Sequence, residues 1–409
     1  MIRFVSIAAL IGVFAGPVFA DGLRFRTELS ANGAWNDPGS LDAAFGFQNR
    51  TTTGASARLM WDKSIGSFLF EVHSHLSFSQ GDNVTYAAAA TPFSPAPAPA
   101  TLFDFSSTWL SDTDTLVTNT IDRLSVTYTT PSLVLKLGRQ SITWGSGMFF
   151  HPSDIVAPFA PNAIDTSYKP GADMIYAQYL FDSGADIQGI IVPRAPTLGG
   201  SVDLDFSTIA MRAQFQLASL DAGVMLARDR GDTVASVELS GPLAGASWNA
   251  EYVNWTLANG DTQPSWLFNI SNFGTIGEMN IAYFAEYFHN GFGVDASVPL
   301  DSLPASLSKR MSTGQVFLPG VNFLALGANV QITPDLSITP NALISLGDRS
   351  ALASLAVNYT LSDSTNLVFN YSQPIGATGT EFGGRETSAG SGIYATPARS
   401  TTLQLVQFF

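Results

Sequence analysis

Two histidines and a glutamate form the sequence pattern with the most evident chemical potential. Glu71, His73 and His75 are spaced two residues apart, so in a β-strand all three side chains would point to the same face. Imidazole and carboxylate groups arranged in this way can bind a metal ion or act as a general base. Because many other polar residues surround them, we interpret them as a polar lining and predict no metal site.

Other catalytic patterns are missing from the sequence. The chain has no cysteine, which excludes thiolate metal sites, a cysteine nucleophile and haem attachment through Cys-x-x-Cys-His. It also lacks a phosphate-binding glycine loop, a zinc-protease helix motif and a nucleophile elbow. We therefore expect neither enzyme activity nor a cofactor. The net charge of -14 argues against a nucleic-acid partner, because phosphate binding requires a basic face.

The elements that would position these side chains read as β-strands. In segments such as 70–78, 124–128 and 209–217, apolar and polar residues alternate over about 10 residues, the pattern of a transmembrane strand. Only 13% of residues are charged, about half the share in a soluble domain. Beyond residue 20 no apolar run could form a spanning helix, and a chain without one crosses a bilayer only as a closed barrel. A soluble β-sandwich would also alternate, with its apolar face turned inward.

The N-terminus predicts export. Arg3 precedes an apolar run over 4–16, and Val18-Phe19-Ala20 supplies the small residues that signal peptidase accepts. We expect cleavage before Asp21, giving a signal peptide over 1–20 and a barrel over 21–409. The alternative, a membrane-anchoring helix, would need about 20 apolar residues, which this run does not reach.

Short turns and other, mostly longer connections alternate along the chain. We count eight turns and nine loops, which predicts an all-β fold: a transmembrane antiparallel barrel of 18 strands with both termini on the turn side. An error of one hairpin in this segmentation would give 16 strands. An even strand number with short periplasmic turns is typical of outer-membrane barrels.

If the apolar side chains face lipid, their polar neighbours line the lumen. The predicted basic lining comes from the first half of the chain: Arg24, Arg26, Arg58, Arg123, Lys136 and Arg212. The predicted acidic lining comprises Glu28, Glu71, Glu238, Glu251, Glu278 and Glu286. Opposite signs would then tend to occupy opposite walls and produce a field across a water-filled pore. Alternatively, these charges form local ion pairs that fill and rigidify the lumen.

The last residues, Thr402–Phe409, resemble the closing strand of Gram-negative outer-membrane barrels. That resemblance implies recognition of Phe409 by the barrel assembly machinery and a location in the outer membrane, surrounded by its lipid. Gln407 departs from the pattern, since the family often has an apolar residue there.

The connection over 141–171 is predicted to fold into the lumen. It contains three mid-loop prolines and several aromatic residues, among them Trp144, which would be costly to leave in water. It follows Gly138-Arg139-Gln140 and so resembles the third loop of porins, which enters the lumen after a Gly-Arg motif. The resemblance implies that Asp154 and Asp165 are loop acids facing a basic wall of Arg24, Arg26, Arg58 and Arg123. Gly-Arg-Gln followed by Trp-Gly is also similar to alginate-export-like channels, so the subfamily stays open.

The connection over 79–120 contains an Ala/Pro-rich stretch, Ala87–Ala100, that favours an extended spacer. It could latch onto a neighbouring subunit, as in trimeric porins, and so imply a homotrimer, or form a surface loop. Together these features predict a channel for small hydrophilic solutes or ions. The alternative is an export conduit or structural sleeve for a partner such as a polysaccharide, a lipid or a cytochrome.

Overall fold

The computed structural model describes residues 22–90, 101–161, 163 and 168–409. The predicted signal peptide over 1–20 lies outside this part of the chain. The strands are β1 (Leu23–Trp35), β2 (Asn49–Ile65), β3 (Phe68–Gly81), β4 (Ser106–Ser111), β5 (Thr115–Thr129), β6 (Leu133–Gln140), β7 (Ala172–Leu180), β8 (Asp186–Val192), β9 (Thr208–Leu217), β10 (Leu220–Asp229), β11 (Asp232–Leu243), β12 (Ala246–Thr256), β13 (Thr262–Ile276), β14 (Met279–His289), β15 (Asn322–Thr333), β16 (Leu336–Ser345), β17 (Ala351–Ser362), β18 (Thr365–Ile375), β19 (Arg385–Glu386), β20 (Tyr394–Ala395) and β21 (Arg399–Phe408).

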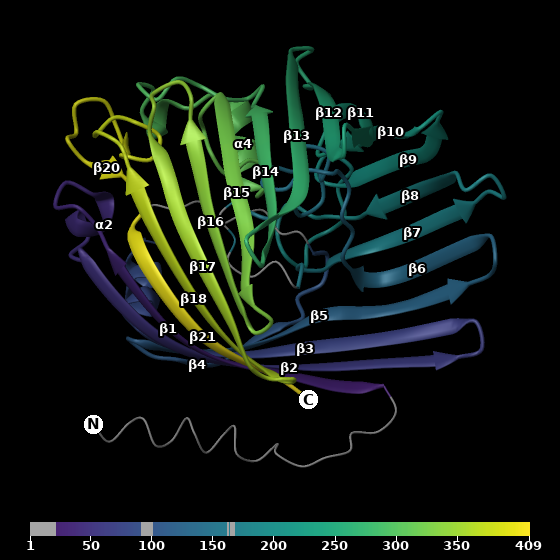
Figure 1. Ribbon diagram of the computed structural model, residues 1–409, viewed down its shortest axis with the longest axis horizontal. Helices are drawn as coiled ribbons and strands as arrows, with labels where there is room; N and C mark the ends of the chain where they lie inside the picture. Colours follow the sequence, from purple (N-terminus) through teal and green to yellow (C-terminus); the bar gives the residue numbers. More distant parts are fainter. Residues whose placement is uncertain (1–21, 91–100, 162, 164–167) are drawn as a thin grey trace.

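Sequential antiparallel pairing closes these strands into a barrel. Each barrel strand pairs with the next barrel strand along the chain, so β3 pairs with β5, and β21 pairs with β18 on one side and with β1 on the other. Figure 1 shows β18, β21 and β1 side by side at this closure. In the described part of the chain the main sheet has 19 strands, and β4 is a short addition to the edge of β5. The remaining 18 strands form the barrel, as the sequence predicts.

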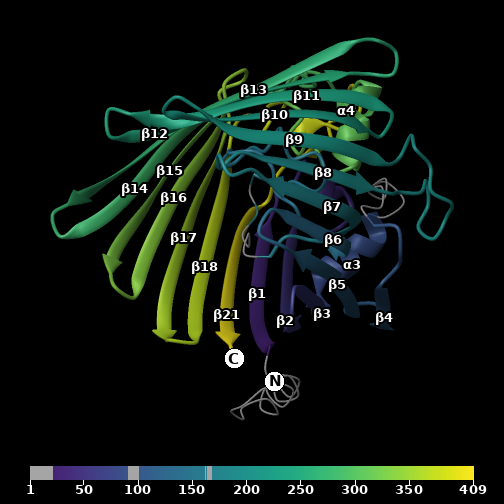
Figure 2. The same cartoon turned by 90° about the vertical axis from the view of Figure 1, so that its right-hand side faces the viewer.

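The connections follow the predicted alternation of turns and loops. Strand β1 begins and β21 ends at the same rim, near the N and C labels at the bottom of Figure 2, and the short turn between β17 and β18 lies beside them. Ala244 and Gly245 connect β11 to β12, and both have positive φ angles, 49° and 86°. Such a pair matches the twist of the flanking strands and permits a two-residue hairpin.

The two faces of the barrel wall differ in chemistry. On β9 the outward side chain of Met211 is 59% exposed, whereas the inward Arg212 is 7% exposed. On β10, Leu226 is 68% exposed and faces outward, while its neighbour Met225 is buried inside. Exposed apolar side chains on the outer face are what a membrane-spanning barrel presents to lipid.

Short helices occur only in the connections of the described chain: α2 (Leu41–Ala44), α3 (Asp82–Ala90), α4 (Ala305–Ser312) and the 3-10 helix η3 (Leu300–Ser302). None of the described helices has the length and apolar character needed to cross a membrane.

Candidate channel and the loops that narrow it

The described part of the loop over 141–171 folds into the barrel, as predicted, and a buried glutamate of the wall holds it. Glu286 on β14 accepts hydrogen bonds from three successive backbone amides, those of Met148, Phe149 and Phe150, at 2.6, 2.9 and 2.9 Å. Asn269 on β13 donates to the same carboxylate at 3.1 Å. Glu286 has no exposed surface, so its role in this structure is to bind the loop.

A second glutamate holds the preceding part of the loop. Glu251 on β12 accepts the backbone amide and the hydroxyl of Ser146. Trp144 lies deeper among the strands, where its indole N–H donates to Gln188 at 2.8 Å. Glu251 was predicted to line the pore; its side chain does point inward, but the loop covers it.

A second connection, 290–321, enters the barrel beside the first and is held by an arginine. Arg310 on α4 forms ion pairs with Asp229 and Asp232 at the hairpin of β10 and β11. Its guanidinium lies 3.9 Å from the ring centroid of Trp255. Gln315 then bridges the two loops, since it donates to the carbonyl of Ile155 and to Asp229, both at 2.8 Å.

These loops pack on apolar side chains that point into the barrel. Trp144, Ile155 and Leu307 from the loops contact inward residues of β7 to β12 such as Met225 and Val253, and all are buried. Phe150 and Phe382, the latter from the connection between β18 and β21, form a second cluster over inward residues of β13 to β17. We refer to β7–β15 together with the connections over 141–171 and 290–321 as the sealed half of the barrel. Its inward positions combine apolar residues with polar ones such as Arg212 and Glu251, so the expectation of a largely polar lining is met only in part there.

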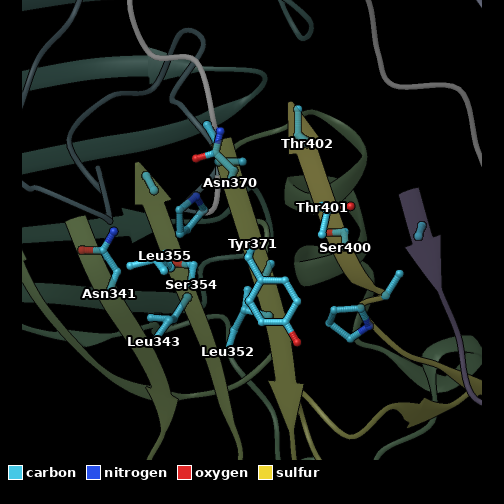
Figure 3. A pocket seen from close by; sticks show the side chains of 18 of the residues that line it. Asn341, Leu343, Leu352, Ser354, Leu355, Asn370, Tyr371, Ser400, Thr401 and Thr402 are labelled. Atoms are coloured by element: carbon cyan, nitrogen blue, oxygen red, sulfur yellow. The ribbon is translucent and has the colours of Figure 1, made fainter. Parts of the chain in front are cut away.

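The opposite side of the lumen remains open. A cavity of about 560 Å³ lies between the loop residues 148–163 and the wall formed by β16, β17, β18, β21 and β1. Figure 3 shows its wall residues Asn341, Ser354, Asn370 and Thr402 on neighbouring strands. We call β16–β18, β21 and β1–β3 the open half.

A second cavity of about 260 Å³ continues along the same wall toward the turn side. Asn32 and Thr402 line the first cavity, while Glu28 and Gln404, further along the same two strands, line the second. Arg26, Arg58 and His75 also border this second cavity. The predicted lining residues Arg26, Glu28 and Arg58 thus lie beside an open space.

Most predicted basic residues have a nearby acidic partner. The pairs are Arg24–Asp62, Arg26–Glu28, Arg58–Asp122, Lys136–Glu71 and Arg212–Glu238. Arg123 instead donates to Ser141 and to the carbonyl of Lys169, at the base of the inward loop. This geometry supports the alternative of local ion pairs that rigidify the lumen and argues against two walls of opposite charge. The reason is that basic partners from nearby strands neutralise Glu71 and Glu238.

Three acidic predictions have other outcomes. Glu278 lies in the exposed turn between β13 and β14, so its assignment to the pore lining is wrong. Asp154 is buried and forms an ion pair with Lys169 of its own loop, so it does not face the predicted basic wall. Asp165 lies outside the described residues.

The histidine pattern is only partly assembled. His73 contacts Asp62 at 2.9 Å and Tyr168 at 2.7 Å, and ligand atoms of Asp62, Glu71 and His73 lie within 4.8 Å of one another. Arg24 and Lys136 already pair with the two carboxylates, which removes the negative charge that would attract a cation. His75 lies apart, at the second cavity.

Known structures with the same architecture are outer-membrane proteins. The BenF-like porin of Pseudomonas fluorescens superposes with a TM-score of 0.53 at 10% identity, over 95% of this chain and 98% of that one. OccAB1 of Acinetobacter baumannii gives 0.50 at 12% identity, over 97% and 98%. The chain has the fold of an outer-membrane channel barrel.

Another similar structure is Wzi of Escherichia coli, described as an outer-membrane protein involved in group 1 capsule assembly and a carbohydrate-binding β-barrel. It gives a TM-score of 0.54 at 10% identity, over 93% of this chain and 83% of that one. No protein-family model and no curated protein sequence matches this chain.

The Gly-Arg-Gln motif has a structural explanation in this channel fold. Gly138 has a φ of +116°, and an added Cβ would lie 2.1 Å from the carbonyl oxygen of Leu124, so only glycine fits. Arg139 then turns to the outward face and pairs with Asp173 on β7 at 2.9 Å. The amides of Leu102 and Phe103 donate to Asp173, so the connection over 79–120 covers this ion pair. The motif therefore fixes the start of the inward loop.

Sequence reasoning missed the residues that fix the inward connection over 290–321. Asp229, Asp232 and Arg310 are buried charges, yet Arg310 is 81 positions from Asp229 and 78 from Asp232, and no local motif marks them. It also missed the neutral wall of the open half, because asparagines and serines at alternate positions signal only a polar face.

Proposed function

We propose that this protein is an outer-membrane channel through which small hydrophilic solutes diffuse along the open half of its barrel. The observation that carries the proposal is the cavity between the inward loop and β16–β18, β21 and β1, whose wall presents hydroxyl and amide groups. The exposed apolar band outside supports a location in the outer membrane. The similarity to porin structures supports the same function, although it extends only to the fold.

An export conduit or sleeve for a partner is the second candidate. Two loops fill one half of the lumen, which would suit a barrel that binds a polymer at its outer rim rather than one that passes solutes freely. Wzi, whose description names carbohydrate binding, has the same architecture. We rank this candidate below the channel because the open half retains two cavities stacked along β1 and β21.

Reconstitution into a planar lipid bilayer distinguishes the two. The channel predicts stable conductance steps, smaller than those of an unobstructed 18-stranded barrel because the loops narrow the lumen. Insertion of folded protein without any conductance would contradict it and favour the sleeve.

We further propose that Phe409 serves as the assembly signal, since it lies at the turn-side end of the barrel and is partly exposed. A homotrimeric assembly stays a prediction, and residues 91–100 of the Ala/Pro stretch lie outside the described part of the chain.

A further inference from the structure

We propose that the cavity of the open half is a selectivity site for neutral polyhydroxylated solutes of about sugar size, in preference to charged solutes. This proposal rests on the channel function and specifies its substrate class. The cavity, about 560 Å³, is within the range of small-molecule sites.

The wall of the cavity offers hydrogen bonds without charge. Its inward side chains include the amides of Asn32, Asn341 and Asn370 and the hydroxyls of Ser354 and Thr402. An amide provides both donors and acceptors, and a hydroxyl provides one donor and two acceptors. Such a surface can replace the water around a solute hydroxyl, whereas an ion would lose hydration without gaining an opposite charge.

Two of these amides have unsatisfied hydrogen-bonding capacity. In the described structure Asn341 Oδ1 and Asn370 Nδ2 are enclosed and have no protein hydrogen-bond partner. Asn341 Oδ1 lies against Gly327, since a Cβ added at that glycine would come within 2.3 Å of this oxygen. These two atoms have almost no exposed surface, so the contacts that the two amides can make with a solute come from their other atoms on the cavity lining.

Charge at the cavity is neutralised. Arg50 pairs with Asp42 at 2.7 Å, and its guanidinium lies over the ring of Tyr86 at 4.1 Å. His151 is the other residue on the described lining that can carry a positive charge, and burial, followed by the charge of Lys169, lowers its pKa to about 4. At neutral pH the described lining thus contains no unpaired charge.

The loop side of the cavity is apolar and aromatic. Phe149 and Phe159 line it opposite the hydroxyl and amide wall, and Phe149 is fixed by packing on Phe284, with ring centroids 5.5 Å apart. A sugar ring has hydroxyl groups at its edge and C–H groups on its faces. It can therefore satisfy both sides of this cavity at once, which a simple ion cannot.

Swelling of proteoliposomes containing the full-length barrel tests this preference. The solutes are glucose, glucuronate and protonated glucosamine, which share a six-membered sugar ring and differ mainly in charge, with glycine as a small reference solute at pH 6. We expect glucose to enter about tenfold faster than either charged sugar, equivalent to about 1.4 kcal/mol of barrier. Equal entry of glucose and glucuronate would overturn the proposal.

Variants locate the preference in the cavity. Replacement of both amides, in N341L/N370L, should slow glucose several-fold while glycine enters at the wild-type rate. The matched control is Asn358→Leu, on β17 but beyond the residues that line the cavity. A glucose rate that is unchanged in N341L/N370L would overturn the site. Failure of glycine and every other solute to enter the wild-type liposomes would overturn the channel function itself.

Discussion

The sealed and open halves of the barrel have the same strand architecture, but their interiors are filled differently. In β7–β15, apolar inward residues such as Met225 and Val253 lie among polar ones, and loops cover them. Inward positions of β16–β18, β21 and β1 carry mostly asparagine, serine and threonine and border the cavity, while Leu343 and Leu352 also pack in the cluster around Phe150 and Phe382. The barrel provides a frame, and the inward side chains decide where a loop binds and where water remains.

Buried carboxylates distinguish the halves as clearly as apolar residues do. Glu251 and Glu286 accept loop amides, and Asp229 and Asp232 accept Arg310. A buried carboxylate is stable only if its hydrogen bonds are satisfied. Each of these residues therefore stabilises one defined loop position, and removal of its partner should release that loop.

Release of the inward loop over 141–171 should have the largest effect on conductance. The double variant E251Q/E286Q weakens bonds between charged carboxylates and four backbone amides, each worth about 1.5–3 kcal/mol. We expect single-channel conductance to rise several-fold because the loop leaves the lumen. The control is Glu278→Gln, in the exposed turn, which should leave conductance unchanged. Equal conductance in wild type and E251Q/E286Q would show that the loop does not limit the passage.

Release of the connection over 290–321 should have a smaller effect on conductance. Arg310→Met removes one ion pair from Asp229, which keeps Arg194 and Arg230, and one from Asp232, which keeps Lys309. Breaking a buried ion pair costs about 3–5 kcal/mol. We expect a protease added to the outside to cut within 290–321 in this variant but not in the wild type. Lys309→Met is the matched control, because this neighbour is 41% exposed and an exposed pair contributes little. Resistance of both variants would contradict the role of Arg310.

A charge introduced into each half should sharpen the comparison further. Asn370→Asp places a carboxylate beside the open cavity, so the reversal potential in a salt gradient should move toward cation preference. Asn249→Asp places the same charge on β12, where Asn249 donates to Asn269 in the sealed half at 2.7 Å. We expect little change in selectivity from this second variant. A larger shift in reversal potential from Asn249→Asp than from Asn370→Asp would place the passage in the sealed half and contradict the account.

The smallest effect concerns pH. His151 is neutral in the docked loop because burial lowers its pKa to about 4 from the ordinary 6.5. A released loop binds a proton below pH 6.5, so docking is fully stable above that pH and weakens as the pH falls toward 4. Brief openings should become more frequent over this window in single-channel records, and His151→Gln should abolish the change. The same pH response in the variant would exclude His151 as its source.

The sequence predicted the frame better than the interior. Strict alternation and the order of turns and loops are local patterns, and they were sufficient for 18 strands. The inward loop over 141–171 followed from its prolines and aromatic residues and from the resemblance to porins. Whether an inward residue faces water or a loop depends on contacts between distant segments, such as Arg310 with Asp229. Glu278 shows another limit, because a shift of a few residues at a turn changes a lumen residue into an exposed one.

Cysteine accessibility tests most directly whether the passage lies in the open half. The native chain has no cysteine, so each variant carries a single thiol. Ser354→Cys lies on the open cavity, and Ser236→Cys lies inward on β11 in the sealed half, where Ser236 is 3% exposed. With a membrane-impermeant thiol reagent, we predict a stepwise block of conductance in Ser354→Cys and no block in Ser236→Cys. Block of Ser236→Cys with Ser354→Cys unaffected would contradict the account.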